Sequence, residues 1–356
     1  MPVPLPRPRA VVLLLALAAA LLLAPSAMAS HGGSLYTQTN DPAGNNVQRF
    51  DRAADGSLTP AGTFATGGLG LASLGGRQGA VALSGDEKYL YAVNAGSDSV
   101  SVFRAGRRTK LVDTAASRGA APASVAEHRG RVYVLNSGGA PSVSAFWQRR
   151  DGALKPIPGG TRELAAGAAG AAQVSVTPDG RSLVVSERVS NRLETLPLDF
   201  LGRPGAPVVT ASNGAVPFGF GITRQGTIVV SEAGASTVSS YREGFGGALR
   251  TITASLPVGQ GAACWVAVSP SGRFAYTGNA AGGISGFAVG RDGSLTALGT
   301  TNLVPSPRDL AFDSSGRFLY AVSPGGQVTS YRVGSDGSLA PAGSAPAAIG
   351  ITGAAA

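Results

Sequence analysis

Two carboxylates in this chain stand at the ends of matching apolar segments. Glu187 ends the segment "SLVVSE", and Glu232 ends "TIVVSE". A third charged residue, Arg308, stands in "PSPRDL", where another apolar segment begins. A carboxylate can transfer a proton, and a guanidinium can bind an anion. The sequence therefore raises the question of whether the fold brings these groups to one site.

Other residues that could do chemistry are few. Cys264 is the only cysteine, so no intrachain disulfide can form, and its place in "ACWVAV" predicts a buried, inert thiol. His31 and His128 stand beside no Ser or Cys nucleophile in the sequence. The acidic residues show no cluster with metal-ligand spacing, so we expect neither a metal site nor a cofactor.

The chain repeats itself. Seven segments alternate apolar and polar residues, turn at Asp-Gly or an equivalent, and begin another strand at Leu or Val, which predicts a β-hairpin. They begin at Val47, Val100, Val143, Leu193, Val238, Ile284 and Val328, at intervals of 43–53 residues. A second hairpin precedes most of them, as in "QVSVTPDGRSLVVSE" and "CWVAVSPSGRFAYTGN". Each repeat therefore holds four short antiparallel strands, here named a to d.

Four-stranded repeats of this length assemble as blades around a central channel, with strand a innermost. We predict an all-β fold, a seven-bladed β-propeller. The first repeat lacks a strand a, whereas the chain ends in "AAIGITGAA", an apolar strand without a partner. We therefore expect residues 348–354 to pair beside the strand around residues 35–39 and to close the ring without a free edge.

In antiparallel blades the b–c loops and the links into strand a lie on one face, which we call the mouth of the channel. In such a fold, the place where polar groups converge on a concave mouth is the first candidate for a binding site. The candidate residues are Asn94, Asn136, Glu187, Glu232 and Asn279 at the loop starts, and Gln173 and Arg308 at the entrances to strand a. Cys264-Trp265 also stands at an entrance. The alternative is structural: Asn often caps turns, and Arg308 could pair with Asp309 or a Glu.

The N-terminus has the form of a secretory signal. Arg7 and Arg9 precede the apolar run at residues 10–24, and Ala27-Met28-Ala29 resembles a signal-peptidase site. The run is shorter than the roughly 20 residues of a membrane span. We expect residues 1–29 to be a signal peptide and residues 30–356 to be one exported propeller, a monomer without stable membrane insertion.

The composition is that of a folded chain, with 44% hydrophobic and 14% charged residues. The formal charge is +9, but the basic residues are scattered and do not alternate with aromatics. We therefore expect no nucleic-acid partner. Attraction to small anions or to anionic cell-surface polymers is the milder inference.

The sequence resembles the seven-bladed β-propeller lactonase family, which includes 6-phosphogluconolactonase-like proteins and carboxymuconate cyclases. The resemblance rests on "VTPDGRSLVV", "IVVSEAGASTVSSY", "CWVAVSPSGRFAYTGN", "PRDLAFDSSGRFLYAV" and repeated "DGSL" turns, and covers the mature chain. It implies that Glu232 is a general base and Arg308 a partner for a carboxylate or oxyanion. Two family positions differ, because Ala172 replaces a His and Phe218 replaces an Arg.

Three functions remain open. The first is a hydrolase or cyclase of a small, anionic lactone, with Glu232 at a solvent-accessible loop start. The second is a non-catalytic propeller that binds a sugar, a cell-surface polymer or a protein through Glu187, Glu232 and Arg308. The third is a purely structural propeller. Catalysis requires Glu232 and Arg308 to flank one small ligand at a water-accessible cavity.

Overall fold

A computed structural model describes residues 1–3, 31–72, 78–302 and 306–356. Except for its first three residues, the predicted signal peptide lies outside the described residues. No described helix is long and apolar enough to cross a membrane. The single described 3₁₀ turn is η2 (Phe245–Gly247).

The strands form seven four-stranded antiparallel sheets, which confirms the predicted number of blades. Blade 1 is β28 (Thr352–Ala355), β1 (His31–Gln38), β2 (Asn46–Ala53) and β3 (Leu58–Ala65). Blade 2 is β4 (Val81–Leu83), β5 (Tyr89–Asn94), β6 (Ser99–Arg104) and β7 (Lys110–Ala116). Blade 3 is β8 (Ala120–His128), β9 (Arg131–Gly138), β10 (Ser142–Gln148) and β11 (Leu154–Glu163). Blade 4 is β12 (Ala171–Val176), β13 (Ser182–Glu187), β14 (Arg192–Pro197) and β15 (Val208–Ala211).

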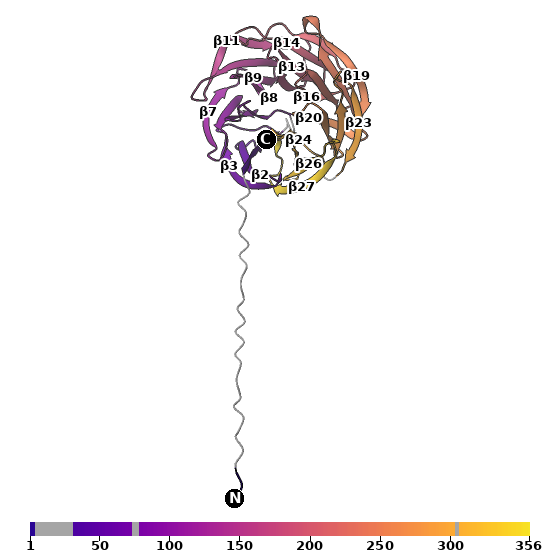
Figure 1. The fold of residues 1–356 in the computed structure, drawn as a ribbon. Helices are drawn as coiled ribbons and strands as arrows, with labels where there is room; N and C mark the ends of the chain where they lie inside the picture. Colours follow the sequence, from indigo (N-terminus) through magenta and orange to yellow (C-terminus); the bar gives the residue numbers. More distant parts are fainter. Residues whose placement is uncertain (4–30, 73–77, 303–305) are drawn as a thin grey trace.

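The last three blades complete the ring. Blade 5 is β16 (Pro217–Ile222), β17 (Thr227–Glu232), β18 (Thr237–Glu243) and β19 (Leu249–Pro257). Blade 6 is β20 (Gly261–Val268), β21 (Phe274–Ala281), β22 (Ile284–Val289) and β23 (Leu295–Thr301). Blade 7 is β24 (Asp309–Phe312), β25 (Phe318–Ser323), β26 (Gln327–Val333) and β27 (Leu339–Pro346). Figure 1 shows the blades in chain order around the ring, with the C-terminus near its centre.

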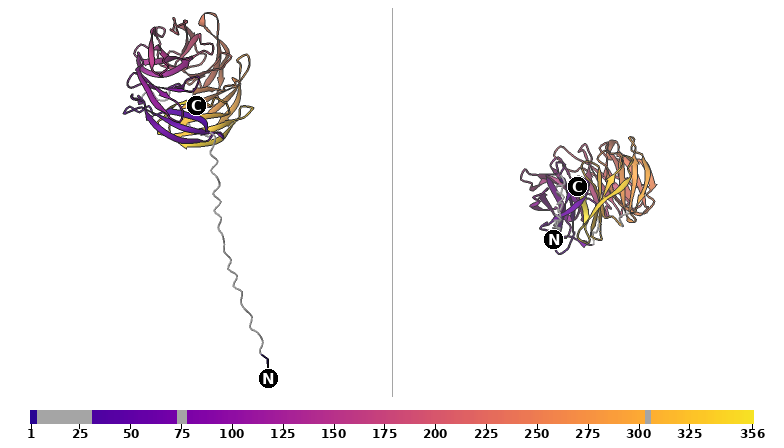
Figure 2. Two further views of the ribbon diagram at one scale, coloured as in Figure 1. Left: turned by 60° about the vertical axis from the view of Figure 1, so that its left-hand side comes forward. Right: turned by 60° about the horizontal axis from the view of Figure 1, so that its bottom comes forward.

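The C-terminal strand closes the ring, as the sequence predicts. Tyr36 pairs with Ala355 and Gln38 with Thr352, so β28 becomes strand a of blade 1. The indigo and yellow ends of the described ring accordingly lie side by side (Figures 1 and 2). The strand begins at Thr352, later than the expected residue 348, because the Gly350 N–H bonds to the carbonyl of Pro324 and holds the preceding residues in a turn.

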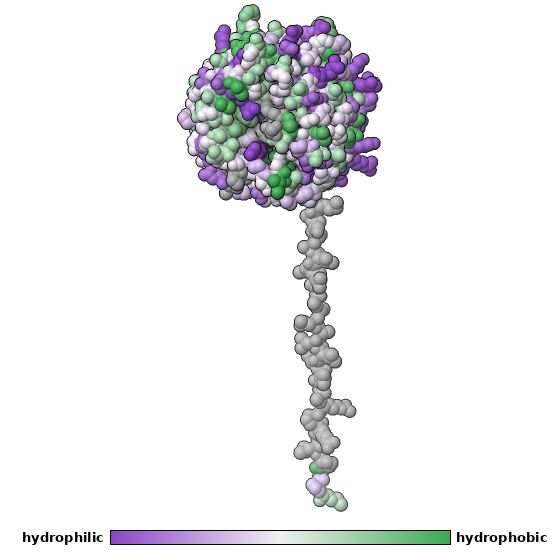
Figure 3. All heavy atoms as spheres, turned by 180° about the vertical axis from the view of Figure 1, so that it is seen from behind, coloured by the Kyte–Doolittle hydropathy of each residue, from purple (hydrophilic) through white to green (hydrophobic). Residues whose placement is uncertain are grey.

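The hydrophobic core lies between the blades. Among the described residues, seven apolar clusters each join side chains of two neighbouring blades. The b strands supply fully buried segments such as β13 and β17, whereas outer strands such as β3 are mostly exposed or half-buried. Figure 3 shows that hydrophilic and hydrophobic side chains are interspersed over one face, without one broad apolar area.

The repeated Asp-Gly turns have a packing role. In blade 1, the Asp55 carboxylate accepts the Ser57 N–H at 2.9 Å, and Gly56 adopts a φ of 91°. A Cβ at Gly56 would lie 2.2 Å from the ring of Phe318 in blade 7. The turn therefore needs Gly both for its backbone conformation and for its contact with the preceding blade.

Candidate functional site

Glu232 is fully buried at the end of β17. Its carboxylate accepts hydrogen bonds from the Gly214 N–H at 2.8 Å and the Ser239 hydroxyl at 2.7 Å. The Thr237 hydroxyl also donates to it, and the Ser212 hydroxyl does so at 3.2 Å. The expected solvent exposure is therefore wrong, because the side chain lies between β18 and the link into β16.

Glu187 occupies the same position in blade 4. Its carboxylate lies 3.0 Å from the Nε atom of Arg192 and also accepts a bond from the Ser190 hydroxyl. Arg192 reaches a second buried carboxylate, Glu194, at 3.0 Å. Burial and the neighbouring Glu187 raise the pKa of Glu194 to about 8. Both carboxylates thus belong to one buried network within the blade.

The three candidate asparagines repeat this arrangement. Asn94 donates to Ser101 at 2.7 Å, Asn136 to Ser144 at 3.2 Å, and Asn279 to Ser285 at 2.8 Å. All three asparagines are fully buried. The loop-start side chain therefore fastens strand c in each of these blades, which is the structural role that the turn chemistry of Asn suggested.

Gln173 binds the edge of a neighbouring inner strand. Its amide donates to the Phe220 carbonyl at 2.8 Å and accepts the Phe220 N–H at 2.7 Å. Gln78 bonds in the same way to Val266 of blade 6, accepting its N–H at 2.8 Å. Inner strands expose unpaired backbone groups to the channel, and these two amides satisfy some of them.

Asp309 lies in the channel, at a cavity of about 280 Å³ that Gln78, Gln173 and His128 also line. Its carboxylate accepts the N–H groups of Leu310 at 2.8 Å and Ala354 at 3.0 Å. Burial nevertheless raises the pKa of Asp309 to about 8. Asp309 thus ties β24 to the closing strand β28.

Arg308 is half-buried at the seam between blades 7 and 1. It lines a cavity of about 430 Å³ together with Asn40, Asp41 and Ile349. Its Nε atom is buried and has no hydrogen-bond partner among the described residues. Glu232 does not line this cavity, and no ion pair joins Arg308 to either candidate glutamate within the described part of the chain. The two predicted catalytic residues therefore neither pair with each other nor share this cavity.

A buried apolar cluster lies at the entrances to β16 and β20. It contains Phe218, Cys264 and Trp265, with the two aromatic rings edge to face at 5.7 Å. Ser186 donates to the Phe218 carbonyl, and Ser231 donates to the Cys264 carbonyl at 2.9 Å. The b strands of blades 4 and 5 thereby fix the entrances to β16 and β20.

A second arginine, which the sequence analysis missed, lies over this cluster. The guanidinium carbon of Arg188 is 5.2 Å from the centre of the Phe218 ring. Burial raises the pKa of Cys264 to about 11, and the positive charges of Arg308 and Arg188 oppose that rise. Arg188 directly follows Glu187 in the sequence, but nothing in the sequence shows that its side chain crosses to the next blade.

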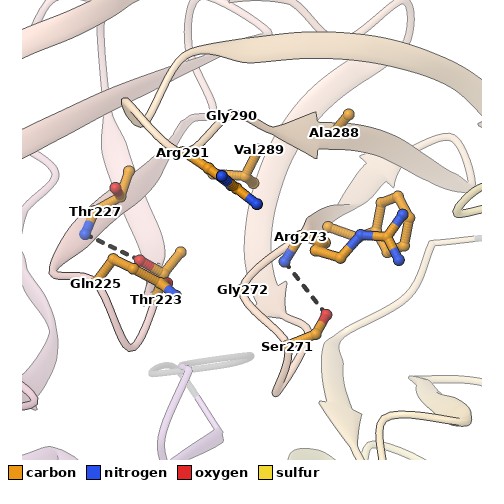
Figure 4. Close-up of a pocket in the computed structure, with 11 residues that line it drawn as sticks. Thr223, Gln225, Thr227, Ser271, Gly272, Arg273, Ala288, Val289, Gly290 and Arg291 are labelled. Atoms are coloured by element: carbon orange, nitrogen blue, oxygen red, sulfur yellow. Dashed lines mark hydrogen bonds between the residues drawn. The ribbon is translucent and has the colours of Figure 1, made fainter.

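A larger cavity of about 500 Å³ lies on the opposite face, between turns of blades 5 and 6. Figure 4 shows the Thr227 N–H bonded to Thr223 and the Arg273 N–H bonded to Ser271. None of the predicted site residues lines it. Among the described residues, no three His, Cys, Asp or Glu side chains are grouped so that they could hold a metal ion.

The seven closed blades define the protein class as a β-propeller. The sequence model of the family described as "Lactonase, 7-bladed beta-propeller" matches residues 142–268 and 274–350, so the chain belongs to this family. No curated protein matches the chain.

Several solved structures share the fold. A 6-phosphogluconolactonase candidate from Bacteroides uniformis is 19% identical, with a TM-score of 0.73 over 87% of this chain and 94% of the other. A protein from Lactobacillus plantarum is 20% identical, with a TM-score of 0.76 over 91% and 99%. The periplasmic gluconolactonase PpgL of Pseudomonas aeruginosa is 18% identical, with a TM-score of 0.70 over 90% and 98%.

Proposed function

We propose that this chain is an exported member of the lactonase family that binds a small anionic lactone, or the hydroxy acid formed from it, at the channel mouth. The observation that carries the proposal is the half-buried Arg308, whose Nε atom has no partner among the described residues although it lines a cavity. A guanidinium placed in this way is suited to a carboxylate or an oxyanion.

The geometry favours binding more than hydrolysis. Glu232 would need a water molecule and a substrate beside its carboxylate, yet five side-chain or backbone donors already surround it. Its assignment as general base therefore stays a hypothesis that the resemblance suggests. The relatives described as gluconolactonases favour turnover as the second candidate function.

The two candidates are separated by one set of assays on residues 30–356. The probes are the γ-lactone of α-hydroxyglutarate, which carries a carboxylate, the open acid, and neutral γ-butyrolactone. Calorimetry measures binding, and a pH-indicator assay measures ring opening. We expect the two anionic probes to bind. Release of acid above the uncatalysed rate would establish a lactonase, whereas binding without release would establish a non-catalytic propeller. Absence of binding by every probe would contradict the proposal.

Export is supported by the charged and apolar N-terminal segment and by the small residues before Ser30. A sugar, a cell-surface polymer or a protein is the alternative occupant of the mouth. Such a partner would bind while all three small probes fail.

A further inference from the structure

We propose that the face opposite the mouth binds an anionic polysaccharide, and that the cavity between blades 5 and 6 holds one of its charged sugar units. This face carries the a–b and c–d turns of the blades and is here called the turn face. The inference does not depend on the proposed function, because it concerns another face and another ligand.

The cavity lies where blade 5 has a small side chain at the start of strand b. This residue is Thr227, which lines the cavity. In three other blades the first residue of strand b is aromatic: Tyr89, Phe274 and Phe318. The Tyr89 ring fills the seam to the next blade so closely that a Cβ at Gly152 would lie 2.5 Å from it. Thr227 leaves more room, and the resulting volume of about 500 Å³ is that of a ligand pocket.

The lining of the cavity is basic and polar. Arg273 and Arg291 supply two guanidiniums, whereas Thr223, Gln225 and Ser271 supply hydroxyl and amide groups. Figure 4 shows Thr223 and Gln225 on one side and Ser271 with Arg273 on the other, with Arg291 between them in this view. Among the described residues, no carboxylate lines the cavity.

The lack of a carboxylate distinguishes this turn from its counterparts. In the a–b turn of blade 4, the Asp179 carboxylate accepts the Arg181 N–H at 3.1 Å and lies 3.8 Å from the Nε atom of Arg181. In blade 6 the equivalent residue is Ser271, which accepts the Arg273 N–H at 3.3 Å. Arg273 therefore forms no ion pair within the described residues.

Both guanidiniums are available to a ligand. The guanidinium carbon of Arg273 lies 5.1 Å from the centre of the aromatic ring that follows it in the sequence, and one amino group donates to the Ser335 carbonyl at 3.3 Å. These contacts position Arg273 but leave most of its five N–H donors without a partner in the described part of the chain. Arg291 is exposed, and its side chain makes no hydrogen bond or ion pair with a described residue. The adjacent carboxylate, Asp292, instead accepts the N–H of Ser294 at 3.0 Å and its hydroxyl at 2.7 Å.

A sugar that carries an oxyanion matches this lining. A guanidinium only donates hydrogen bonds, so Arg273 and Arg291 require acceptor oxygens, preferably charged ones. Hydroxyl and amide side chains both donate and accept, so Thr223, Gln225 and Ser271 suit the hydroxyls of a sugar ring. A sugar unit with a sulfate or a carboxylate offers both kinds of group.

The positive charge extends beyond the cavity, which favours a polymer over a single sugar. On blades 5 to 7, six exposed arginines stand in or beside the a–b and c–d turns: Arg224, Arg250, Arg273, Arg291, Arg317 and Arg332. The carboxylates in or beside the same turns are Glu243, Asp292, Asp313 and Asp336. None of these four forms an ion pair with the six arginines among the described residues. Several positive groups on one face attract a chain of negative charges more strongly than a single one.

The test measures binding of dextran sulfate to residues 30–356 by calorimetry. Uncharged dextran is the matched probe, and about 150 mM salt screens long-range attraction. We expect dextran sulfate to bind and dextran not to bind. Arg273→Met and Arg291→Met should each weaken dextran sulfate about 10-fold or more, because a hydrogen bond to a charged group is lost. Ser271→Asp should also weaken it, since it places beside Arg273 the carboxylate that Asp179 provides in blade 4.

Arg149→Met is the matched control. Arg149 is exposed in the c–d turn of blade 3, on the same face but outside the cavity, and lies 3.4 Å from Asp151. The variant removes the same charge as Arg273→Met and should change the affinity for dextran sulfate much less. Thermal melts should show that all four variants fold.

Three results would overturn the inference. If Arg149→Met weakens binding as much as Arg273→Met, the polymer responds to net charge alone and the cavity is not its site. If dextran binds as tightly as dextran sulfate, the recognition of an anion is wrong. Phe200 and Phe245 are exposed at turns of blades 4 and 5, so phosphatidylglycerol vesicles test a membrane as the partner. Sedimentation with these vesicles without binding of dextran sulfate would replace the polysaccharide by a membrane. The lactone assays at the mouth are independent of all three results.

Discussion

Truncation of Glu232 tests whether its buried network stabilises the fold. Glu232→Ala removes the acceptor of the Gly214 N–H and of the Ser239 and Thr237 hydroxyls. Hydroxyls can rotate to new partners, but the amide cannot. An orphaned buried donor costs about 1–3 kcal/mol, and the cavity left by the side chain adds to this. We expect a loss of about 3 kcal/mol, a large fraction of the stability of a typical domain.

Glu232→Gln should be milder. The amide oxygen can still accept from Gly214 and Ser239, and the new amide group can donate to the Thr237 hydroxyl once that hydroxyl rotates. We expect a loss of about 1 kcal/mol, that of one ordinary hydrogen bond. Urea unfolding followed by fluorescence measures both variants. Glu163→Ala, which removes an exposed carboxylate at the end of β11, is the control and should match wild type.

The reasoning would be refuted if Glu232→Ala had the unfolding midpoint of wild type. The carboxylate would then make no measurable contribution to the stability of the fold, and the hypothesis that it acts as a general base would regain support.

Three further predictions follow from the fold and the sequence. Burial beside Glu187 raises the pKa of Glu194 from its ordinary 4.5 to about 8. Between these two pH values the folded chain keeps the Glu194 proton, which the unfolded chain releases. The contribution of this protonated group to the free energy of unfolding is complete below pH 4.5 and should be lost as the pH rises through about 8. Glu194→Gln should therefore reduce the change in urea midpoint between pH 5 and 8. Deletion of residues 352–356 removes β28 and exposes the edge of β1, so it should lower the melting temperature and promote aggregation, measured by calorimetry and light scattering. Mass spectrometry of the exported protein should find an N-terminus at Ser30, whereas an intact residue 1 would reject the signal peptide.

The fold could be predicted from the sequence because the same strand and turn pattern occurs seven times, so that an unclear pattern in one repeat is compensated by the others. Seven hairpins with Asp-Gly or equivalent turns leave few alternatives to a propeller. The C-terminal segment, which has no partner of its own in the sequence, predicted the closure. The exact start of β28 could not be predicted, since it depends on the contact between Gly350 and Pro324 in another blade.

The site was harder to predict for a physical reason. Sequence position places Glu232 and Asn94 at the mouth face, but it does not show whether a side chain turns into the channel or back into its own blade. Their partners, Gly214 for Glu232 and Ser101 for Asn94, become apparent only when the links are placed in space. Arg188 illustrates the converse, because its contact with Phe218 crosses between blades.

The most direct test of the central claim is the affinity of the mouth for an anionic lactone with and without Arg308. Calorimetry should compare wild type and Arg308→Met, which keeps most of the apolar stem, using the γ-lactone of α-hydroxyglutarate and neutral γ-butyrolactone. We expect the anionic lactone to bind wild type and to lose about 10-fold or more of its affinity in the variant, as expected for loss of a hydrogen bond to a charged group. Equal affinities of the two proteins for the anionic lactone, or tighter binding of the neutral one, would contradict the account.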